Sequence, residues 1–391
     1  MPFQRTARLD LLPPYLFIDI DRKKRAALAA GKDVIDFGVG DPDRPTPKFI
    51  IDRMAEAIYD PKNHRYPFDT GVPEYREVAA AFFKKRFGVA IDPQKEIIAL
   101  IGSKEGLGHL PLAVINPGQV GLIPTPGYPV YNAATLFAGG VPYEMPLCNE
   151  RGFLPDIEAI PAGVLDKTAL MFLNYPNNPT GAVAPLEFYE KCVRLSKKHD
   201  FVICSDAPYT ETYFDDADRP HSIMEIPGAK DVAIEMHSLS KTFNMTGWRV
   251  AFAVGQPDVL AALAKVKGNV DSGVFGAVQH AAIAALQGVE RPEVAEIRQI
   301  YKERRDLLVP MLNKYGFRVE LPRATFFVWA RCPEGYSSMD CSTKLLEEAA
   351  IVAIPGIGFG KHGDGYVRFA LTVERDRIAS AESRLAKLKW S

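Results

Sequence analysis

The chain has 391 residues, of which 47% are hydrophobic and 24% are charged, and its formal net charge is −1. This length exceeds the size at which one hydrophobic core stops growing, so we expect two domains in an ordinary globular protein. A net charge near zero argues against nucleic acids and membrane surfaces as partners, because binding to either depends on clustered positive charge. Small polar or zwitterionic substrates remain open.

The cysteines and the apolar runs indicate a cellular location. Five cysteines without a Cys-x-x-Cys pair favour reduced thiols in a cytoplasmic protein. The first residues lack the apolar core of a signal peptide, and no apolar run is long enough to cross a bilayer. We therefore expect a cytoplasmic protein without a membrane partner, and we predict no metal ion.

Two helices are predicted before residue 95. Ile50–Ile58 and Pro73–Phe87 have the spacing of amphipathic helices, and the turn-rich stretch His64–Val72 joins them. The pattern then changes to short apolar runs that alternate with helical stretches.

This alternation, between about residues 95 and 255, is typical of a mainly parallel sheet covered by helices. The predicted fold class is therefore α/β, with one large sheet. Ligands of such sheets bind beyond the carboxyl ends of the strands, so the residues that follow each strand are the candidates for chemistry. The seven predicted strands are Ile97–Ile101, Val120–Pro124, Pro142–Leu147, Ala169–Leu173, Phe201–Ser205, Val232–His237 and Val250–Val254.

A smaller α+β domain is predicted after residue 290. Its elements are a charged helix, Pro292–Leu312, two strand-like pieces, Arg318–Leu321 and Thr325–Ala330, a helix, Ser342–Ala350, and a last strand, Tyr366–Leu371. We place an N-terminal segment that joins this small domain at residues 1–45, the large domain at 46–285 and the small domain at 286–391.

The stretch His237–Arg249 carries the most chemical information. Lys241 can form a Schiff base with an aldehyde, while Ser238, Ser240 and Arg249 are the residue types that hold a phosphate dianion. A single lysine or serine is most often a solvated surface residue, so the hypothesis depends on the whole cluster. An aldehyde that carries a phosphate indicates pyridoxal 5′-phosphate as the cofactor.

Other predicted strand ends add weaker signals. Asp206 follows a buried strand, where its carboxylate needs a cation: either a protonated pyridine nitrogen or a buried arginine. The turn Gly102–Gly106 presents N–H groups suited to a phosphate, although such turns also hold glycine for steric reasons alone. Tyr128 is placed either to stack on a ring or to pack, and the turn Asn174–Gly181 is either a donor to a cofactor oxygen or an Asx turn.

Arg368 lies in the last predicted strand, where its neighbours alternate as in a half-buried strand. A guanidinium held in this way is suited to binding a substrate carboxylate through two hydrogen bonds. A structural salt bridge is the alternative.

These residues together resemble the class I/II, fold-type I pyridoxal-phosphate aminotransferases, over essentially the whole chain. The resemblance lies in Ser238–Lys241 with an arginine eight residues further on, in Asn174–Gly181 and in Ser205–Tyr209. The stretches that are most similar to the subgroup of LL-diaminopimelate aminotransferases are Gly102–Gly106, His237–Arg249 and Asp271–Phe275.

The resemblance implies a role for each candidate residue. Lys241 is the Schiff-base lysine and moves the proton, Asp206 pairs with the pyridinium nitrogen, and Tyr128 stacks on the ring. Asn178 and Tyr209 contact the phenolic oxygen. The phosphate is surrounded by Ser103, Lys104, Ser238, Ser240 and Arg249, with Tyr66 from the partner of a homodimer, and the substrate contacts are Arg368 with its α-carboxylate, Gly40, Tyr15, Asn178 and Asn269.

The implied reaction is an amino transfer in two half-reactions, with homodimer active sites built from both chains. Glutamate donates the amine, and the open keto form of tetrahydrodipicolinate accepts it to give LL-diaminopimelate in lysine biosynthesis. The alternatives are an alanine, aspartate or aromatic aminotransferase and a β-lyase of the same fold. A non-catalytic ligand sensor would need an added DNA-binding module and basic charge, and the sequence shows neither.

Overall fold

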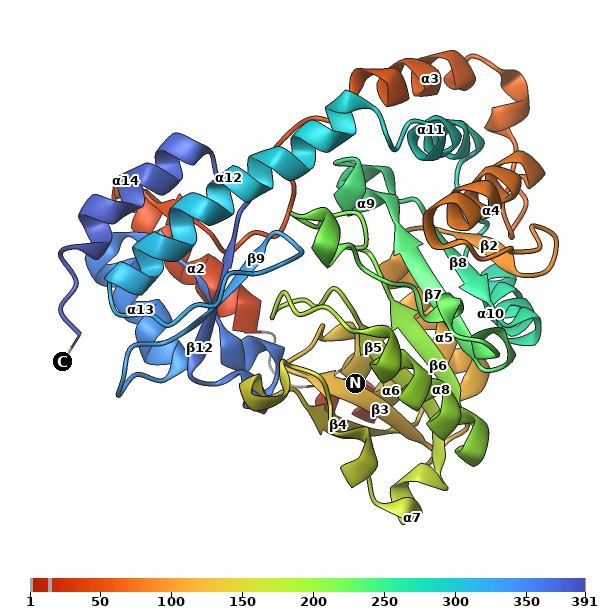
Figure 1. Cartoon of the computed structure of the whole chain (residues 1–391), viewed down its shortest axis with the longest axis horizontal. Helices are drawn as coiled ribbons and strands as arrows, with labels where there is room; N and C mark the ends of the chain where they lie inside the picture. Colours follow the sequence, from red (N-terminus) through yellow and green to blue (C-terminus); the bar gives the residue numbers. More distant parts are fainter. Residues whose placement is uncertain (1–2, 13–15, 391) are drawn as a thin grey trace.

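A computed structural model describes residues 3–12 and 16–390 of the chain. Figure 1 shows a large twisted sheet with helices on both sides and, at the left, a smaller group of helices and strands around β12. The strands are β1 (Ile35–Asp36), β2 (Ile97–Leu100), β3 (Val120–Thr125), β4 (Val141–Pro146), β5 (Thr168–Asn174), β6 (Val202–Asp206), β7 (Ala233–Ser238), β8 (Ala251–Gly255), β9 (Phe327–Arg331), β10 (Ile351–Val352), β11 (Ile354–Pro355) and β12 (Tyr366–Ala370).

The large sheet has seven strands in the order β2-β8-β7-β6-β5-β3-β4. Its strands are parallel except β8, which runs antiparallel to both β2 and β7. All seven predicted strands are present, and each end lies within one residue of its predicted position. The carboxyl ends of β2, β5, β6 and β7 therefore meet at one edge of the sheet, and β8 starts at that edge.

Helices cover both faces of this sheet because its strands are apolar on both sides. Met171 and Leu173 of β5 pack into a core with α4, α8 and α11, while Leu170 and Phe172 face a second core with α5, α6 and α10. The alternation follows from the period of two residues along a strand. The helices are α1 (Ala7–Asp10), α2 (Leu16–Ala29), α3 (Lys48–Ile58), α4 (Pro73–Phe87), α5 (Ser103–Val114), α6 (Val130–Phe137), α7 (Ala162–Leu165), α8 (Leu186–His199), α9 (Leu239–Thr242), α10 (Pro257–Val270), α11 (Gly276–Gln287), α12 (Pro292–Lys314), α13 (Ser338–Ala349) and α14 (Arg375–Leu385).

A further core lies under the three-stranded antiparallel sheet β11-β12-β9. The long helix α12 joins the two parts of the molecule: Val294 packs into the core of the large sheet and Ile297 into the smaller core. Ile35 and Phe37 also belong to the smaller core. The domain boundaries at residues 45/46 and 285/286 stay a prediction.

One predicted strand is wrong. Arg318–Leu321 is not a strand: only Arg318 forms a single β-bridge, to Arg331. The Asn313 side chain explains this, because its amide nitrogen donates to the carbonyl of Val319 at 3.0 Å and its amide oxygen accepts from the Val319 N–H at 2.8 Å. A side chain thus takes the place of a neighbouring strand.

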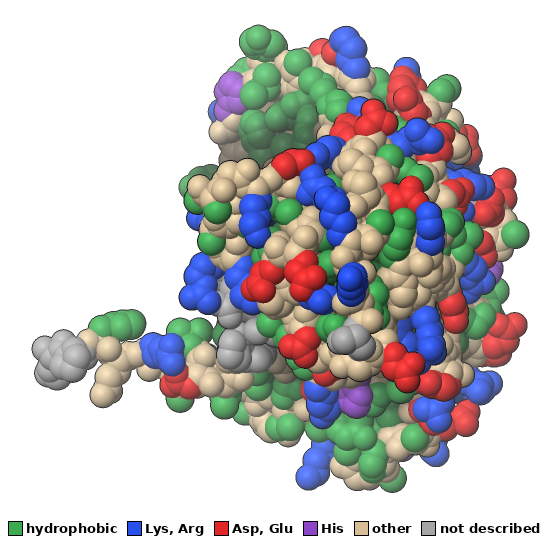
Figure 2. All heavy atoms as spheres, turned by 90° about the vertical axis from the view of Figure 1, so that its left-hand side faces the viewer, with side chains coloured by type: hydrophobic (Ala, Val, Ile, Leu, Met, Phe, Trp, Pro, Cys, Tyr) green, Lys and Arg blue, Asp and Glu red, His purple; other side chains and the backbone are tan. Residues whose placement is uncertain are grey.

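The surface agrees with a near-zero net charge. On the face shown in Figure 2, basic and acidic side chains are interspersed and neither sign forms a continuous area. Within residues 3–12 and 16–390, no helix has both the length and the apolar character needed to cross a membrane.

Candidate active site

A cavity of about 520 Å³ lies at the carboxyl edge of the large sheet, closed on one side by β12 and the residues that follow β11. It brings together residues from opposite ends of the chain, from Gly40 to Arg368. The sequence-predicted residues that line it are Gly40, Ser103, Lys104, Tyr128, Asn178, Asp206, Tyr209, Ser238, Ser240, Lys241, Arg249 and Arg368.

Lys241 lies in the short helix α9, directly after β7. The hydroxyl of Ser238 caps this helix by accepting from the Ser240 N–H at 3.2 Å. Lys241 Nζ donates to the carbonyl of Gly40 at 3.0 Å. Burial lowers the pKa of Lys241 to about 8; Asp41 opposes this shift, and the positive charges of Arg368 and Arg249 add to it. The amine therefore loses its proton at a lower pH than an exposed lysine, as a nucleophile or proton carrier requires.

Asp206 ends β6 and is 3% exposed. Its Oδ2 accepts from the Tyr131 hydroxyl at 2.6 Å, while its Oδ1 has no hydrogen-bond partner among the described residues. Burial raises the pKa of Asp206 to about 7, and the bond from Tyr131 limits the rise. A buried carboxylate oxygen without a partner is costly. Oδ1 of Asp206 can therefore accept a hydrogen bond from a cationic or N–H ligand.

An anion-binding turn lies between β2 and α5. Gly102 has φ 77° and precedes Ser103, the first residue of the 12-residue helix α5, whose N–H groups face the turn. A Cβ atom at Gly102 would lie 2.1 Å from the guanidinium of Arg249, so this side chain would have to move, and the positive φ itself favours glycine. Arg249 itself donates to the carbonyls of Thr246 at 2.8 Å and Ile101 at 3.4 Å. Arg249 thus lies beside the N-terminus of α5.

Arg368 forms the opposite wall of the cavity. Its guanidinium carbon lies 4.2 Å from the ring centre of Phe327 and 4.8 Å from that of Phe359. Nη1 donates to Asn178 Oδ1 at 2.9 Å and Nη2 to the carbonyl of Gly38 at 3.0 Å. A guanidinium held between two rings and two acceptors is fixed in orientation, and this suits recognition of a carboxylate.

Aromatic side chains complete the lining. Tyr209 is 5% exposed and makes edge contacts with Phe326 and Phe327. Burial raises the pKa of its hydroxyl, and Arg368 opposes the shift. Tyr128 lines the same cavity, and Lys104 Nζ lies 5.7 Å from the centre of its ring. Both rings therefore border the cavity that Asp206 also lines.

Two predicted residues do not line the cavity of this single chain, and a third lies outside the described residues. Tyr66 is 89% exposed, and Asn269 is exposed on α10, where its amide donates to the carbonyl of Lys265 at 2.8 Å. Tyr15 lies outside the described residues. Their roles stay predictions.

Sequence reasoning missed several residues of the site. Tyr131 holds Asp206, and Asn174 donates to the Asp206 carbonyl at 2.8 Å and accepts from the Asn178 N–H at 2.9 Å. Phe327 and Phe359 hold Arg368. Tyr131 lies three residues after Tyr128 and its ring contacts that of Tyr128, so a second tyrosine in the same turn was the available signal.

Comparison with known proteins decides the family. Residues 32–385 match the family described as aminotransferase class I and II. The chain belongs to the class I and II aminotransferases. A protein of Syntrophobacter fumaroxidans named LL-diaminopimelate aminotransferase is 54% identical over 390 residues, covering 100% of both chains. One of Aquifex aeolicus with the same name is 50% identical and covers 99% of this chain and 100% of its own length.

Solved structures show the same fold for this aminotransferase. Apo-BacF from Bacillus subtilis superposes with a TM-score of 0.94 at 39% identity and covers 99% of each chain. The predicted fold, a seven-stranded mainly parallel sheet with a smaller α+β part, is thus confirmed. The prediction that the chain is a transaminase is confirmed by its family.

Proposed function

We propose that this aminotransferase binds pyridoxal 5′-phosphate in the cavity at Lys241 and transfers amino groups between glutamate and the keto precursor of LL-diaminopimelate. Lys241 carries the proposal, since it is a half-buried amine with a pKa of about 8 that lies in one cavity with the carboxylate of Asp206. The cofactor would supply an aldehyde for the amino group and a ring that withdraws electrons from the carbon that loses a proton.

The residues of the cavity fit such a cofactor at three points. Asp206 Oδ1 has no hydrogen-bond partner among the described residues, and a protonated ring nitrogen would provide one. The Gly102 turn, with its positive φ, offers N–H groups and Arg249 to a phosphate. Asn178 uses its Oδ1 for Arg368, so its Nδ2 is the group that remains to donate to a ring oxygen.

Arg368, Lys241 and Tyr209 would each have a different role in the reaction. Arg368 would bind the substrate α-carboxylate and so orient the Cα–H bond towards Lys241. The neutral amine of Lys241 would accept that proton and pass it to the carbon that was the cofactor's aldehyde carbon, a role that needs a pKa near the working pH. Tyr209 would donate to a ring oxygen, because burial keeps its hydroxyl protonated.

The acceptor is inferred from the relatives. Two proteins at 54% and 50% identity over nearly the full length are named LL-diaminopimelate aminotransferases, and we propose the same substrate pair here. The purified enzyme should transfer an amino group from LL-diaminopimelate to 2-oxoglutarate with a kcat/KM well above its values for alanine, aspartate and phenylalanine. A preference for one of these three amino acids would overturn the acceptor, and product formed by β-elimination would indicate a lyase.

We also propose a homodimer whose sites take residues from both chains. Large apolar side chains are exposed close together: Tyr66 and Phe68 are 89% and 68% exposed, and the Phe68 carbonyl would lie 3.0 Å from a Cβ at Gly273. Val270, three residues before Gly273, is 61% exposed. Light scattering should give twice the chain mass, and Tyr66→Phe should weaken cofactor binding in the dimer. A monomer with full activity would contradict this proposal.

A further inference from the structure

A buried ammonium group lies directly behind the anion-binding turn. Lys267 belongs to α10, and its side chain has 0% exposure. Its Nζ donates to Glu105 Oε2 at 2.9 Å and lies 3.3 Å from both carboxylate oxygens of Asp271. Burying an ammonium is costly unless it is paired, and two carboxylates pair with this one.

Glu105 connects this ammonium to the turn. The same Oε2 accepts from the backbone N–H of Ile101 at 3.0 Å, and Oε1 is 2.7 Å from His109 Nδ1. The carbonyl of Ile101 in turn accepts from Arg249 at 3.4 Å. Ile101 precedes Gly102, so the residue that leads into the turn is held on one side by Glu105 and on the other by Arg249.

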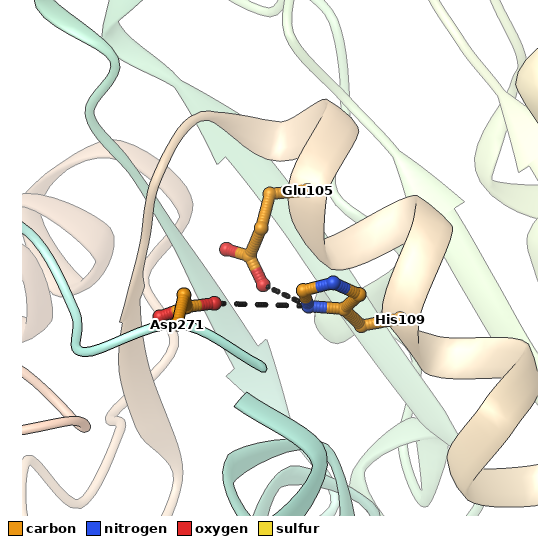
Figure 3. Close-up of side chains that lie close together, drawn as sticks. All are labelled: Glu105, His109 and Asp271. Atoms are coloured by element: carbon orange, nitrogen blue, oxygen red, sulfur yellow. Dashed lines mark hydrogen bonds and ion pairs between the residues drawn. The ribbon is translucent and has the colours of Figure 1, made fainter. Parts of the chain in front are cut away.

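Figure 3 shows Glu105 and His109 on successive turns of α5, with Asp271 reaching towards them from a separate segment. Three such ligand atoms within 4.8 Å of one another also have the composition of a metal site. Here the Lys267 ammonium already supplies a positive charge to both carboxylates. We therefore interpret the cluster as a tether between α10 and α5.

We propose that Lys267 is a positioning residue for the cofactor phosphate: through Glu105 it fixes the Ile101–Ser103 turn at which the phosphate binds. The inference rests on the proposed function, because it assumes a phosphate at this turn. Lys267 does not need to touch the cofactor for this role. Loss of the tether would let the turn shift and weaken the phosphate contacts, while leaving Lys241 and Asp206 in place.

The test compares cofactors with and without the phosphate. Equilibrium dialysis of the full-length protein should give a Kd for pyridoxal 5′-phosphate that rises roughly tenfold in Lys267→Met, the lower end of the effect known for residues that orient the direct ligands of a metal. The Kd for pyridoxal, which lacks the phosphate, should change by less than about twofold. Lys197→Met is the matched control, since Lys197 pairs with Asp231 at 2.7 Å on the surface, and its Kd values should equal those of the wild type.

A second variant separates positioning from stability. Lys267→Met leaves two carboxylates without their cation, whereas Lys267→Met/Glu105→Gln removes one charge of each sign and restores the net charge of the network. The amide can still accept from Ile101, so the double variant should regain the melting temperature but keep the weakened binding of the phosphate cofactor. Recovery of both would make Lys267 purely structural and overturn the inference.

The two proposals can fail separately. A wild-type protein that binds no pyridoxal 5′-phosphate would refute the proposed function. A wild type that binds it, with both Lys267 variants retaining the affinity of the wild type, would refute the positioning role alone.

Discussion

Lys241 should react with an aldehyde at a pH where an exposed lysine is almost inert. Its pKa is about 8, against an ordinary value of 10.5. At pH 7 roughly one molecule in ten would carry the neutral amine, compared with about one in 3,000 for an ordinary lysine, which is a difference of about 300-fold in the reactive form. Burial is the main cause, and the positive charges of Arg368 and Arg249 add to it.

The assay is the rate at which the cofactor-free full-length protein combines with saturating pyridoxal 5′-phosphate between about pH 6 and pH 10. The rate should rise with pH and level off with a midpoint near 8. Asp41→Asn removes the carboxylate that raises the pKa of Lys241, so its midpoint should move to lower pH. Asp206, with a pKa of about 7, titrates nearby, and the Lys241 midpoint should persist in Asp206→Asn.

Two results would refute this reasoning. A wild-type midpoint close to 10.5 would mean that water reaches Lys241 and that burial does not depress its pKa. A midpoint that disappears in Asp206→Asn would assign the titration to the carboxylate instead.

Three further substitutions test the rest of the cavity. Asp206→Asn should stabilise the cofactor-free protein by the order of a few kcal/mol at pH 8 but not at pH 4. Folding raises the pKa of Asp206 from 3.8 to about 7, so the stability of the wild type falls as pH rises through that range. Equal melting-temperature shifts at both pH values would contradict this. Tyr131→Phe removes the 2.6 Å hydrogen bond to Asp206. Cofactor binding measured by calorimetry should weaken about tenfold, since hydrogen bonds to charged groups contribute about 1.5–3 kcal/mol. An unchanged Kd would exclude this role of Tyr131. Arg368→Lys loses the two-bond fork and the contacts with the rings of Phe327 and Phe359. The kcat/KM for amino acid substrates should fall about 100-fold while the cofactor spectrum stays the same. Loss of the cofactor as well would mean that Arg368 binds the cofactor and not the substrate.

Sequence patterns predicted the parts of the site that depend on neighbouring residues. The run Phe201–Ser205 indicated a buried strand, so a carboxylate at its end needed a cation, and Asp206 does lie buried with one oxygen unpaired among the described residues. The stretch from Ser238 to Arg249 was informative because β7 turns directly into α9, which places a lysine and two hydroxyls at one strand end.

Contacts between distant residues could not be predicted in this way. Tyr131 reaches Asp206 across 75 positions, and Lys267 reaches Glu105 across 162. Periodicity shows which side of a helix is apolar, but it does not show which helix will pack opposite. β1 and β10 each have two residues, too few for an alternating pattern, so their parallel pairing was also missed.

The short return from β7 to β8 has a consequence for how such a protein can diversify. Lys241 and Arg249 lie on one U-turn between two antiparallel strands, so their separation is set by a few covalently linked residues. Arg368 lies on β12, in the separate small sheet, and meets the U-turn only across the cavity. Under the proposed function, mutations that reshape the small sheet can therefore change which acid is accepted, whereas an insertion of a single residue between Lys241 and Arg249 would disrupt attachment of the cofactor. We expect natural variation in acceptor choice to accumulate in the small sheet and to be nearly absent from the U-turn between Lys241 and Arg249.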